Sequence, residues 1–180
     1  MIRYEPAVLA LADALRARGW KIATAESCTG GLIAAACTAV AGSSDWFERG
    51  FVTYSNDAKT ELLGVPATLI DAFGAVSAEV ACAMAEGALV HSHAHSHSNS
   101  NSHAHAHAHT QAQLAVAVTG IAGPGGGAPA KPVGTVWVAL AQAGGAAHAE
   151  LLQLAGDRAA VREQTVHAAL AHLLARARAT

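Results

Sequence analysis

The sequence shows no large excess of charge of either sign and no long apolar run. Its 180 residues include 11 Lys and Arg and 13 Asp and Glu, so the formal net charge is −2. Proteins that bind a phosphate backbone usually carry a basic excess, and its absence argues against nucleic-acid binding. No apolar run approaches the roughly 20 residues that span a bilayer, and residues 1–6 lack the apolar core of a signal peptide. We therefore expect a cytoplasmic protein that binds neither nucleic acid nor membrane.

Cysteine and aromatic residues are also scarce. The three cysteines, Cys28, Cys37 and Cys82, are odd in number and show no paired spacing, which argues against a disulfide framework or a zinc knuckle. Aromatic residues make up 4% of the chain and hydrophobic residues 52%, of which much is alanine. Side chains this small favour close packing of helices on a sheet. The length fits one domain with a sizeable core.

Apolar periodicity and capping residues predict the helices. A first helix carries Val8, Leu11 and Leu15 at helical spacing and is expected to end at Gly19. Further helices are predicted at 30–40, at 57–63 with Asn56 as its cap, at 78–90 with Ser77 as its cap, and after Asp157. Gly64 and Pro66 are expected to end the helix at 57–63. The last helix is expected to leave four arginines available to solvent: Arg158, Arg162, Arg176 and Arg178.

Apolar and β-branched runs predict the strands. They lie at 21–25, 47–54, 114–119, 133–140 and 147–154. Residues 142–145 suit a hairpin connection between the last two strands, so the sheet is expected to be mixed. Strands that alternate with helices favour an α/β fold. We predict a single three-layer α/β/α domain over residues 1–180, with a mixed and mostly parallel sheet.

Histidine is concentrated in one segment. Eight of the 11 histidines lie in residues 91–109, where they alternate with Ala, Ser and Asn. A segment with so little to bury is predicted to be a disordered surface loop at 91–112 that interrupts the domain. Alternating imidazoles also bind Ni²⁺, Cu²⁺ or Zn²⁺, so metal handling by this loop is an alternative function. The spacing is repetitive rather than site-like, and we assign no metal or cofactor to the chemistry.

Ser27 lies where a strand passes into a helix, within the run TAESCTGG at 24–31. A serine hydroxyl becomes a nucleophile only when a base takes its proton and nearby donors stabilise the oxyanion. The backbone amides of the turn, from Cys28 and Thr29 to Gly30 and Gly31, are candidate donors. The alternative is that Ser27 or Thr29 is an ordinary helix cap.

Tyr54 and Lys59 are the candidate partners of Ser27. Tyr54 ends a predicted strand and Lys59 lies in the first turn of the next helix, so both can reach the sheet edge where α/β folds bind ligands. A lysine acts as a general base only if burial or a neighbouring cation lowers its pKa. The alternatives are a solvated helix lysine and a packing tyrosine.

A glycine-rich loop at 119–127 follows a buried strand and could approach a phosphate or ribose closely. Within it, Thr119, Gly120 and Gly123 are candidate substrate contacts. The loop matches neither a P-loop nor a dinucleotide fingerprint, and a flexible connection is the alternative.

Several ordered motifs resemble the CinA C-terminal domain family. They are TAESCTGG at 24–31, AGSS at 41–44, GFVTYSN at 50–56, TGIAGP at 119–124 and KPVGTV at 131–136. The resemblance covers nearly the whole chain except 91–112.

The resemblance implies hydrolysis of the carboxamide of nicotinamide mononucleotide, giving nicotinic acid mononucleotide and ammonia in pyridine-nucleotide recycling. Ser27, Tyr54 and Lys59 match the family's catalytic positions. On this basis Ser27 attacks the amide carbon, Lys59 accepts its proton and Tyr54 relays or orients that proton. Water then releases the acyl-enzyme. The resemblance also implies no cofactor and a homo-oligomer.

Two features depart from the family pattern. The histidine-rich insertion is unusual, and the second domain of the longer CinA proteins is not expected before residue 1. The competing function is a catalytically silent nucleotide-binding or interaction domain that uses the glycine-rich loop without acyl transfer.

Overall fold

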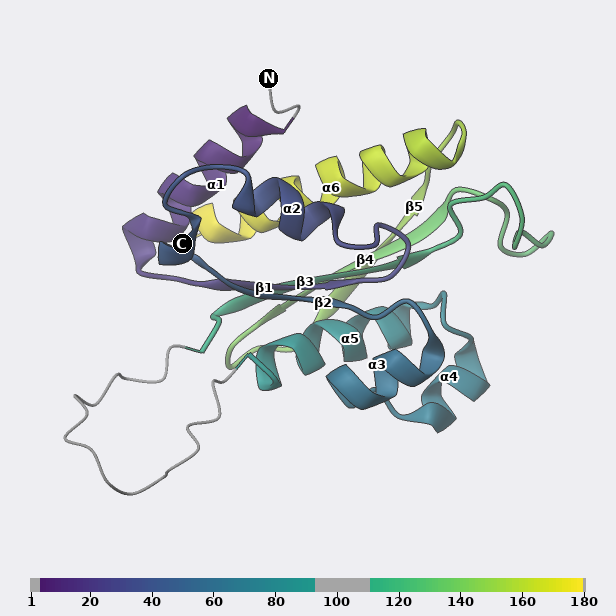
Figure 1. Cartoon of the computed structure of the whole chain (residues 1–180). Coiled ribbons are helices and arrows are strands. Elements are labelled where there is room, and N and C mark those ends of the chain that lie inside the picture. Colours follow the sequence, from purple (N-terminus) through teal and green to yellow (C-terminus); the bar gives the residue numbers. More distant parts are fainter. Residues whose placement is uncertain (1–3, 93–110, 180) are drawn as a thin grey trace.

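The computed structural model describes residues 4–92 and 111–179 and contains one five-stranded sheet between two layers of helices (Figure 1). The strand order is β2-β1-β3-β4-β5. The strands are β1 (Ile22–Glu26), β2 (Phe47–Val52), β3 (Leu114–Gly120), β4 (Thr135–Gln142) and β5 (His148–Gln153). β1 pairs in parallel with β2 and β3, whereas β3–β4 and β4–β5 are antiparallel. The predicted mixed sheet in an α/β fold is confirmed.

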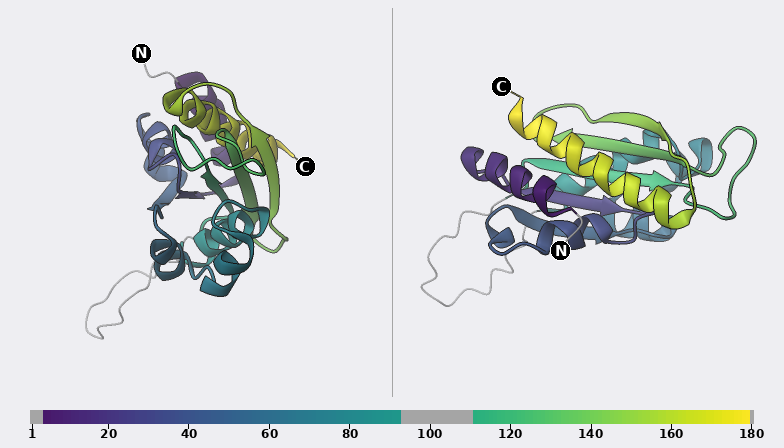
Figure 2. Two further views of the ribbon diagram at one scale, coloured as in Figure 1. Left: turned by 90° about the vertical axis from the view of Figure 1, so that its right-hand side faces the viewer. Right: turned by 90° about the horizontal axis from the view of Figure 1, so that it is seen from above.

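The helices divide between the two faces of the sheet. They are α1 (Glu5–Arg18), α2 (Leu32–Thr38), α3 (Asn56–Leu63), α4 (Ala67–Phe73), α5 (Ala78–Val90) and α6 (Arg158–Arg178). On one face α1 and α6 lie side by side with α2 beside them, and on the other face α5 packs between the sheet and α3 and α4 (Figures 1 and 2). No helix in the described ranges is both long and apolar enough to cross a bilayer.

Side-chain size differs between the two faces because successive residues of a strand point to opposite sides. In β3 the larger side chains, Leu114, Val116 and Val118, pack toward α1 and α6, whereas Ala115 and Ala117 face α5. Alanine on that face lets α5 lie close to the sheet. The predicted close packing of helices on the sheet therefore applies most clearly to the α5 face.

Several predicted element boundaries are corrected by local backbone geometry. Helix α2 begins at Leu32 rather than at Gly30, because Gly30 and Gly31 have φ of 61° and 97°, outside the right-handed helical region. Strand β2 ends at Val52, two residues before Tyr54. The cap of α3 is Ser55 and not Asn56, since the Ser55 side chain accepts a hydrogen bond from the Ala58 amide at 3.0 Å.

Helix α4 was not predicted. Pro66, expected to mark the end of a helix, is the extended residue directly before α4. The ends of the other helices follow the sequence signals more closely: Gly19 and Gly64 adopt left-handed conformations after α1 and α3, and Ser77 and Asp157 cap α5 and α6.

Both ends of the segment predicted as a loop at 91–112 contact the folded part of the chain. His91 accepts a hydrogen bond from Arg49 through its carbonyl, and Ser92 is fully buried. The Ala112 amide donates to the Ser92 hydroxyl at 3.1 Å, so the chain is closed by a direct contact between the two ends of this segment. The disorder predicted for residues 93–110 lies outside the described residues.

Candidate active site

Ser27 is held at the carboxyl end of β1 by its two neighbouring strands. Its amide donates to the Val118 carbonyl of β3 at 3.0 Å, which extends the β1–β3 pairing by one residue. On the other side, the Thr53 amide donates to the Glu26 carbonyl at 2.8 Å. The serine therefore projects from a fixed backbone position, as predicted for a strand-to-turn junction.

Lys59 reaches Ser27 from the first turns of α3. Its Nζ lies 3.3 Å from the Ser27 Oγ, 2.9 Å from the Thr53 carbonyl oxygen and 3.4 Å from the Ser55 carbonyl oxygen. The side chain is 1% exposed, and burial lowers the pKa of Lys59 from 10.5. A solvated helix lysine is therefore excluded.

The three neighbours of the Lys59 Nζ favour one orientation of a neutral amine. Two are carbonyl oxygens, which only accept, and the third is a hydroxyl, which can donate or accept. A neutral Nζ has two N–H groups and one lone pair. If the N–H groups bind Thr53 and Ser55, the lone pair faces the Ser27 hydroxyl, which is the geometry of proton acceptance.

Glu26 determines the shape of the turn after Ser27, and sequence reasoning assigned it no role. Its carboxylate is fully buried and accepts from the Thr29 hydroxyl at 2.7 Å and from backbone amides at the start of α2. Those amides belong to Gly31, Ile33 and Ala34, at 2.8–3.0 Å. A carboxylate at this position satisfies the amides that a helix start leaves unpaired.

Two of the four amides predicted as oxyanion donors already have acceptors within the turn. The Gly31 amide donates to Glu26, and the Gly30 amide donates to the Ser27 carbonyl at 3.1 Å. Thr29 is fully buried, so its amide does not face solvent. The amides of Cys28 and Thr29 have no oxygen acceptor among the described residues and lie against the Cys28 sulfur, and Cys28 is the less buried of the two residues.

Cys28 is next to Ser27 and is a conceivable rival nucleophile. Burial raises the pKa of its thiol to about 11. Since the thiolate is the reactive form of cysteine, a thiol that remains protonated at neutral pH is a poor nucleophile. The side chain that makes a hydrogen bond with buried Lys59 is Ser27.

Two arginines of α6 bind the loops around Ser27. Arg158 is exposed, as predicted, whereas Arg162 is half-buried, which corrects the prediction for it. Arg162 donates to the carbonyls of Cys28 and Thr29 at 3.1 and 2.8 Å. Arg158 donates to the Gly123 carbonyl at 2.8 Å and to the Tyr54 hydroxyl at 3.0 Å. The contacting residues are more than 30 positions apart in sequence, so no local pattern indicated them.

Tyr54 lies between the two residues whose carbonyls bind Lys59, but its side chain points elsewhere. It is 62% exposed, and its hydroxyl contacts Arg158. Within residues 4–92 and 111–179, that hydroxyl has no hydrogen bond to Ser27 or Lys59. The structure thus brings Ser27 and Lys59 together and places the Tyr54 side chain at the rim.

The three residues of the glycine-rich loop that were predicted to contact substrate each contact other parts of the chain. The Thr119 hydroxyl donates to the Ala75 carbonyl at 2.7 Å. A side chain at Gly120 would collide with Val136 and the Thr135 carbonyl of β4. Gly123 is buried, has φ of 81° and anchors Arg158 through its carbonyl. Contact of these three residues with substrate remains a prediction.

No group of three or more His, Cys, Asp or Glu side chains that could hold a metal ion occurs in the described part of the chain. All three cysteines are free thiols. Most of the histidine-rich segment lies outside the described residues, so metal handling by that segment stays an untested alternative.

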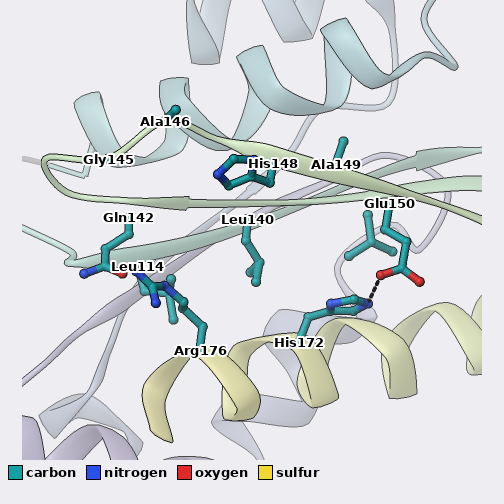
Figure 3. A pocket seen from close by; sticks show the side chains of 11 residues that line it. Leu114, Leu140, Gln142, Gly145, Ala146, His148, Ala149, Glu150, His172 and Arg176 are labelled. Carbon is teal, nitrogen blue, oxygen red and sulfur yellow. Dashed lines mark ion pairs between the residues drawn. The ribbon is translucent and has the colours of Figure 1, made fainter. Parts of the chain in front are cut away.

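A cavity of about 520 Å³ lies between strands β4 and β5 and the second half of α6 (Figure 3). Leu140 lines it, with His172 and Glu150 at one end and Gln142 and Arg176 at the other. No residue predicted for the active site lines this cavity. The Ser27–Lys59 pair is therefore a separate site.

Proteins of known sequence resemble this chain over nearly its whole length. The CinA C-terminal domain model matches residues 5–98 and 96–177. The nicotinamide-nucleotide amidohydrolase PncC of Pseudomonas putida is 51% identical over 164 residues, which is 91% of each chain. The protein of the same name from Escherichia coli K12 is 46% identical, covering 88% of this chain and 85% of the relative. A CinA-like protein of Mycolicibacterium gilvum is 53% identical, but the match covers only 33% of that longer protein.

Solved structures show the same architecture. The competence/damage inducible protein CihA from Agrobacterium tumefaciens superposes with a TM-score of 0.81 at 43% identity, covering 95% of this chain and 93% of that one. A CinA superfamily protein from Klebsiella pneumoniae gives a TM-score of 0.82 at 35% identity and 96% coverage of both chains. The sequence match and the shared fold agree: this chain belongs to the CinA C-terminal domain family.

Proposed function

We propose that this chain is an amidohydrolase that deamidates nicotinamide mononucleotide to nicotinic acid mononucleotide and ammonia, in the recycling of pyridine nucleotides. The observation that carries the proposal is the 3.3 Å contact between the Ser27 Oγ and the Nζ of buried Lys59. The names of the P. putida and E. coli relatives support the substrate.

In the proposed reaction, neutral Lys59 accepts the Ser27 proton as the hydroxyl attacks the carboxamide carbon. The Cys28 amide is our candidate for one oxyanion donor. Lys59 then delivers the proton to the departing nitrogen, so ammonia leaves and an acyl-enzyme remains. Water, deprotonated by Lys59, attacks the ester and restores the Ser27 hydroxyl. The scheme uses neither metal nor cofactor.

Tyr54 is proposed to act at the rim of this site. Its hydroxyl contacts Arg158 instead of Lys59, so a role in positioning the substrate fits the geometry better than a proton relay. Thr119, Gly120 and Gly123 are proposed to border the ribose and phosphate, because Arg158 links the Gly123 carbonyl to Tyr54.

Replacement of the nucleophile tests the chemistry. Ser27→Ala is expected to lower ammonia release from nicotinamide mononucleotide by about 10³-fold or more while the fold is retained. Thr60→Ala is the matched control, because Thr60 is exposed and lies beside Lys59 on α3. Full turnover by Ser27→Ala would contradict the mechanism. Saturable nucleotide binding by the wild type without any turnover would favour the silent binding domain.

We also propose that the protein is cytoplasmic and forms a homo-oligomer. Several large apolar side chains are exposed on the single chain, among them Leu9, Phe73 and Leu151. A second copy could cover such side chains. Sedimentation equilibrium of the full chain tests the assembly, and a mass near 18.1 kDa at all concentrations would contradict it.

A further inference from the structure

We propose that the cavity of about 520 Å³ between β4, β5 and the second half of α6 is a second binding site, for an α-hydroxy acid with an apolar side chain. A volume of this size is typical of small-molecule sites. Neither Ser27 nor Lys59 lines the cavity, so the proposal goes beyond the proposed function. The supporting observations are a buried acceptor without a donor, an uncompensated positive charge and an apolar floor.

Polar side chains replace apolar ones on the faces that surround this cavity. In β4, Val138 packs toward α1 and α6, and alternation along the strand places Gln142 on the same face. In β5, Leu152 packs on that face, and Glu150 lies on it two residues earlier. Helix α6 contributes Arg176 from its last turns. Gln142, Glu150 and Arg176 all line the cavity, so polar groups from three elements converge on it.

Gln142 brings a hydrogen-bond acceptor to one end of the cavity. Its Oε1 is buried and has no hydrogen-bond partner among the described residues. A buried acceptor without a donor is unfavourable, and folded proteins keep few of them. The Gln142 side chain points from β4 toward α6, into the cavity (Figure 3). A ligand that places an O–H group here would supply the missing donor.

Arg176 brings a positive charge to the same end. The side chain is exposed, and within residues 4–92 and 111–179 it forms no ion pair with an acidic side chain. Figure 3 shows it extending from α6 toward Gln142. A guanidinium binds a carboxylate through two parallel hydrogen bonds. The ligand is therefore expected to carry a carboxylate next to the group that donates to Gln142.

The donor beside the carboxylate is expected to be a hydroxyl and not an ammonium. An ammonium would lie beside the Arg176 guanidinium, and the acidic residue that lines the cavity, Glu150, is at the opposite end. There Glu150 pairs with His172 at 3.5 Å. A hydroxyl donates to Gln142 without repulsion between like charges.

The surface between the two ends suits an apolar ligand body. It is formed by three aliphatic side chains, Leu114, Val138 and Leu140. Leu114 and Val138 are almost fully buried beneath it. An apolar side chain on the ligand would cover this surface and exclude water from it. A carboxylate, an adjacent hydroxyl and an apolar side chain together define the α-hydroxy acid.

Two probes that differ only in the hydroxyl test the proposal, 3-phenyllactate and 3-phenylpropanoate. Calorimetry with the full chain should give 1:1 binding of phenyllactate with a Kd on the order of 1 mM or below. Phenylpropanoate should bind about 10-fold more weakly, because it leaves the Gln142 Oε1 without a donor.

Three variants assign the contacts. Arg176→Met should weaken binding of both probes about 10-fold or more, because both carry the carboxylate. Gln142→Leu should abolish the difference between the two probes. Arg178→Met is the matched control, since Arg178 is exposed near the same end of α6 but does not line the cavity, and it should change neither affinity.

Ser27→Ala should bind phenyllactate as tightly as the wild type, so the outcome is independent of the proposed deamidation. Loss of binding in Ser27→Ala would place the probe at the catalytic site and overturn the proposal. So would equal affinities for the two probes, no saturable binding by the folded wild type, or unchanged affinity in Arg176→Met. A change in assembled mass on Arg176→Met or Gln142→Leu, measured by sedimentation equilibrium, would show instead that a second copy of the chain covers the cavity.

Discussion

Single side chains in this protein carry roles that their sequence neighbourhoods do not reveal. Ser27 and Lys59 were predicted to lie together because each follows a strand at the same sheet edge, and their atoms are 3.3 Å apart. Glu26 looked like a strand residue beside the serine, yet its buried carboxylate organises the start of α2. Arg158 and Arg162 reach the site from the last helix. Such contacts depend on tertiary packing and leave no periodic signal.

The lowered pKa of Lys59 makes both activity and stability depend on pH. Because burial disfavours the ammonium form, the unfolded chain binds this proton more tightly than the folded chain. The free energy of unfolding of the wild type, relative to Lys59→Met, should therefore rise with pH from the folded pKa up to about 10.5 and then level off. The rate of ammonia release should also rise with pH as Lys59 loses its proton, and the midpoint of this rise should lie below pH 10.5. Urea denaturation and ammonia-release rates, each measured across pH, check the two expectations. If the stability of the wild type and of Lys59→Met changed with pH in parallel, the lowered pKa of Lys59 would be contradicted.

Glu26→Gln is expected to destabilise the fold and to impair turnover together. The carboxylate accepts from the Thr29 hydroxyl and three backbone amides, and an amide NH₂ in place of one oxygen would face donors instead of acceptors. The loss should be about 2 kcal/mol or more in the free energy of unfolding, measured with urea. Glu86→Gln, an exposed change on α5, is the control and should be neutral. A Glu26→Gln protein as stable as the wild type would contradict this role.

The ends of the helices are determined mainly by capping residues and by glycines with positive φ. A helix could be predicted from the sequence only where these residues are recognisable. Helices α1, α5 and α6 were predicted closely because apolar periodicity and caps agree. Helix α4 was missed because its seven residues carry little amphipathic pattern and follow Pro66. Helix α2 was predicted too long because an alanine-rich run does not show that Gly30 and Gly31 are left-handed.

The cap of α3 can be tested with two neighbouring substitutions. Ser55→Ala should lower the free energy of unfolding by about 1 kcal/mol, because the Ala58 amide at the start of the helix loses its acceptor. Asn56→Ala should change it by only a few tenths, since Asn56 is the first helical residue and provides no cap. The reverse order, measured by thermal or urea unfolding, would show that the original prediction of Asn56 as the cap was right.

The whole molecule is one sheet assembled from two stretches of chain. Strands β1 and β2 come from residues before position 93, and β3, β4 and β5 from residues after 110. The layers and the mixed sheet were predictable from alternating elements and the hairpin signal at 142–145. The active-site rim was not, because it depends on α6 from the second stretch reaching Tyr54 and Cys28 in the first.

Replacement of residues 93–110 by four Gly and Ser residues is expected to leave ammonia release unchanged. The Ser92 hydroxyl and the Ala112 amide are 3.1 Å apart, so a short connection spans the gap. Loop closure becomes less costly in entropy, and the free energy of unfolding should rise on the order of 1 kcal/mol. Removal of His91 and Ser92 as well should reverse this gain, because both make contacts with the folded core. Loss of turnover in a folded protein that lacks only 93–110, or inhibition of the wild type by a chelator, would support a metal role.

Because Ser92 and Ala112 are in direct contact, we expect the candidate active site to form even when the chain between them is cut. Ser27 and Lys59 both lie on the first stretch, whereas Arg158 lies on the second. A polypeptide severed between positions 93 and 110 would leave two fragments, each with an open strand edge, β1 on one and β3 on the other. Reassociation through that parallel pair would restore the rim as well as the sheet. The protein therefore lends itself to fragment complementation, in which recovery of the proposed ammonia release by the mixed halves would report their assembly.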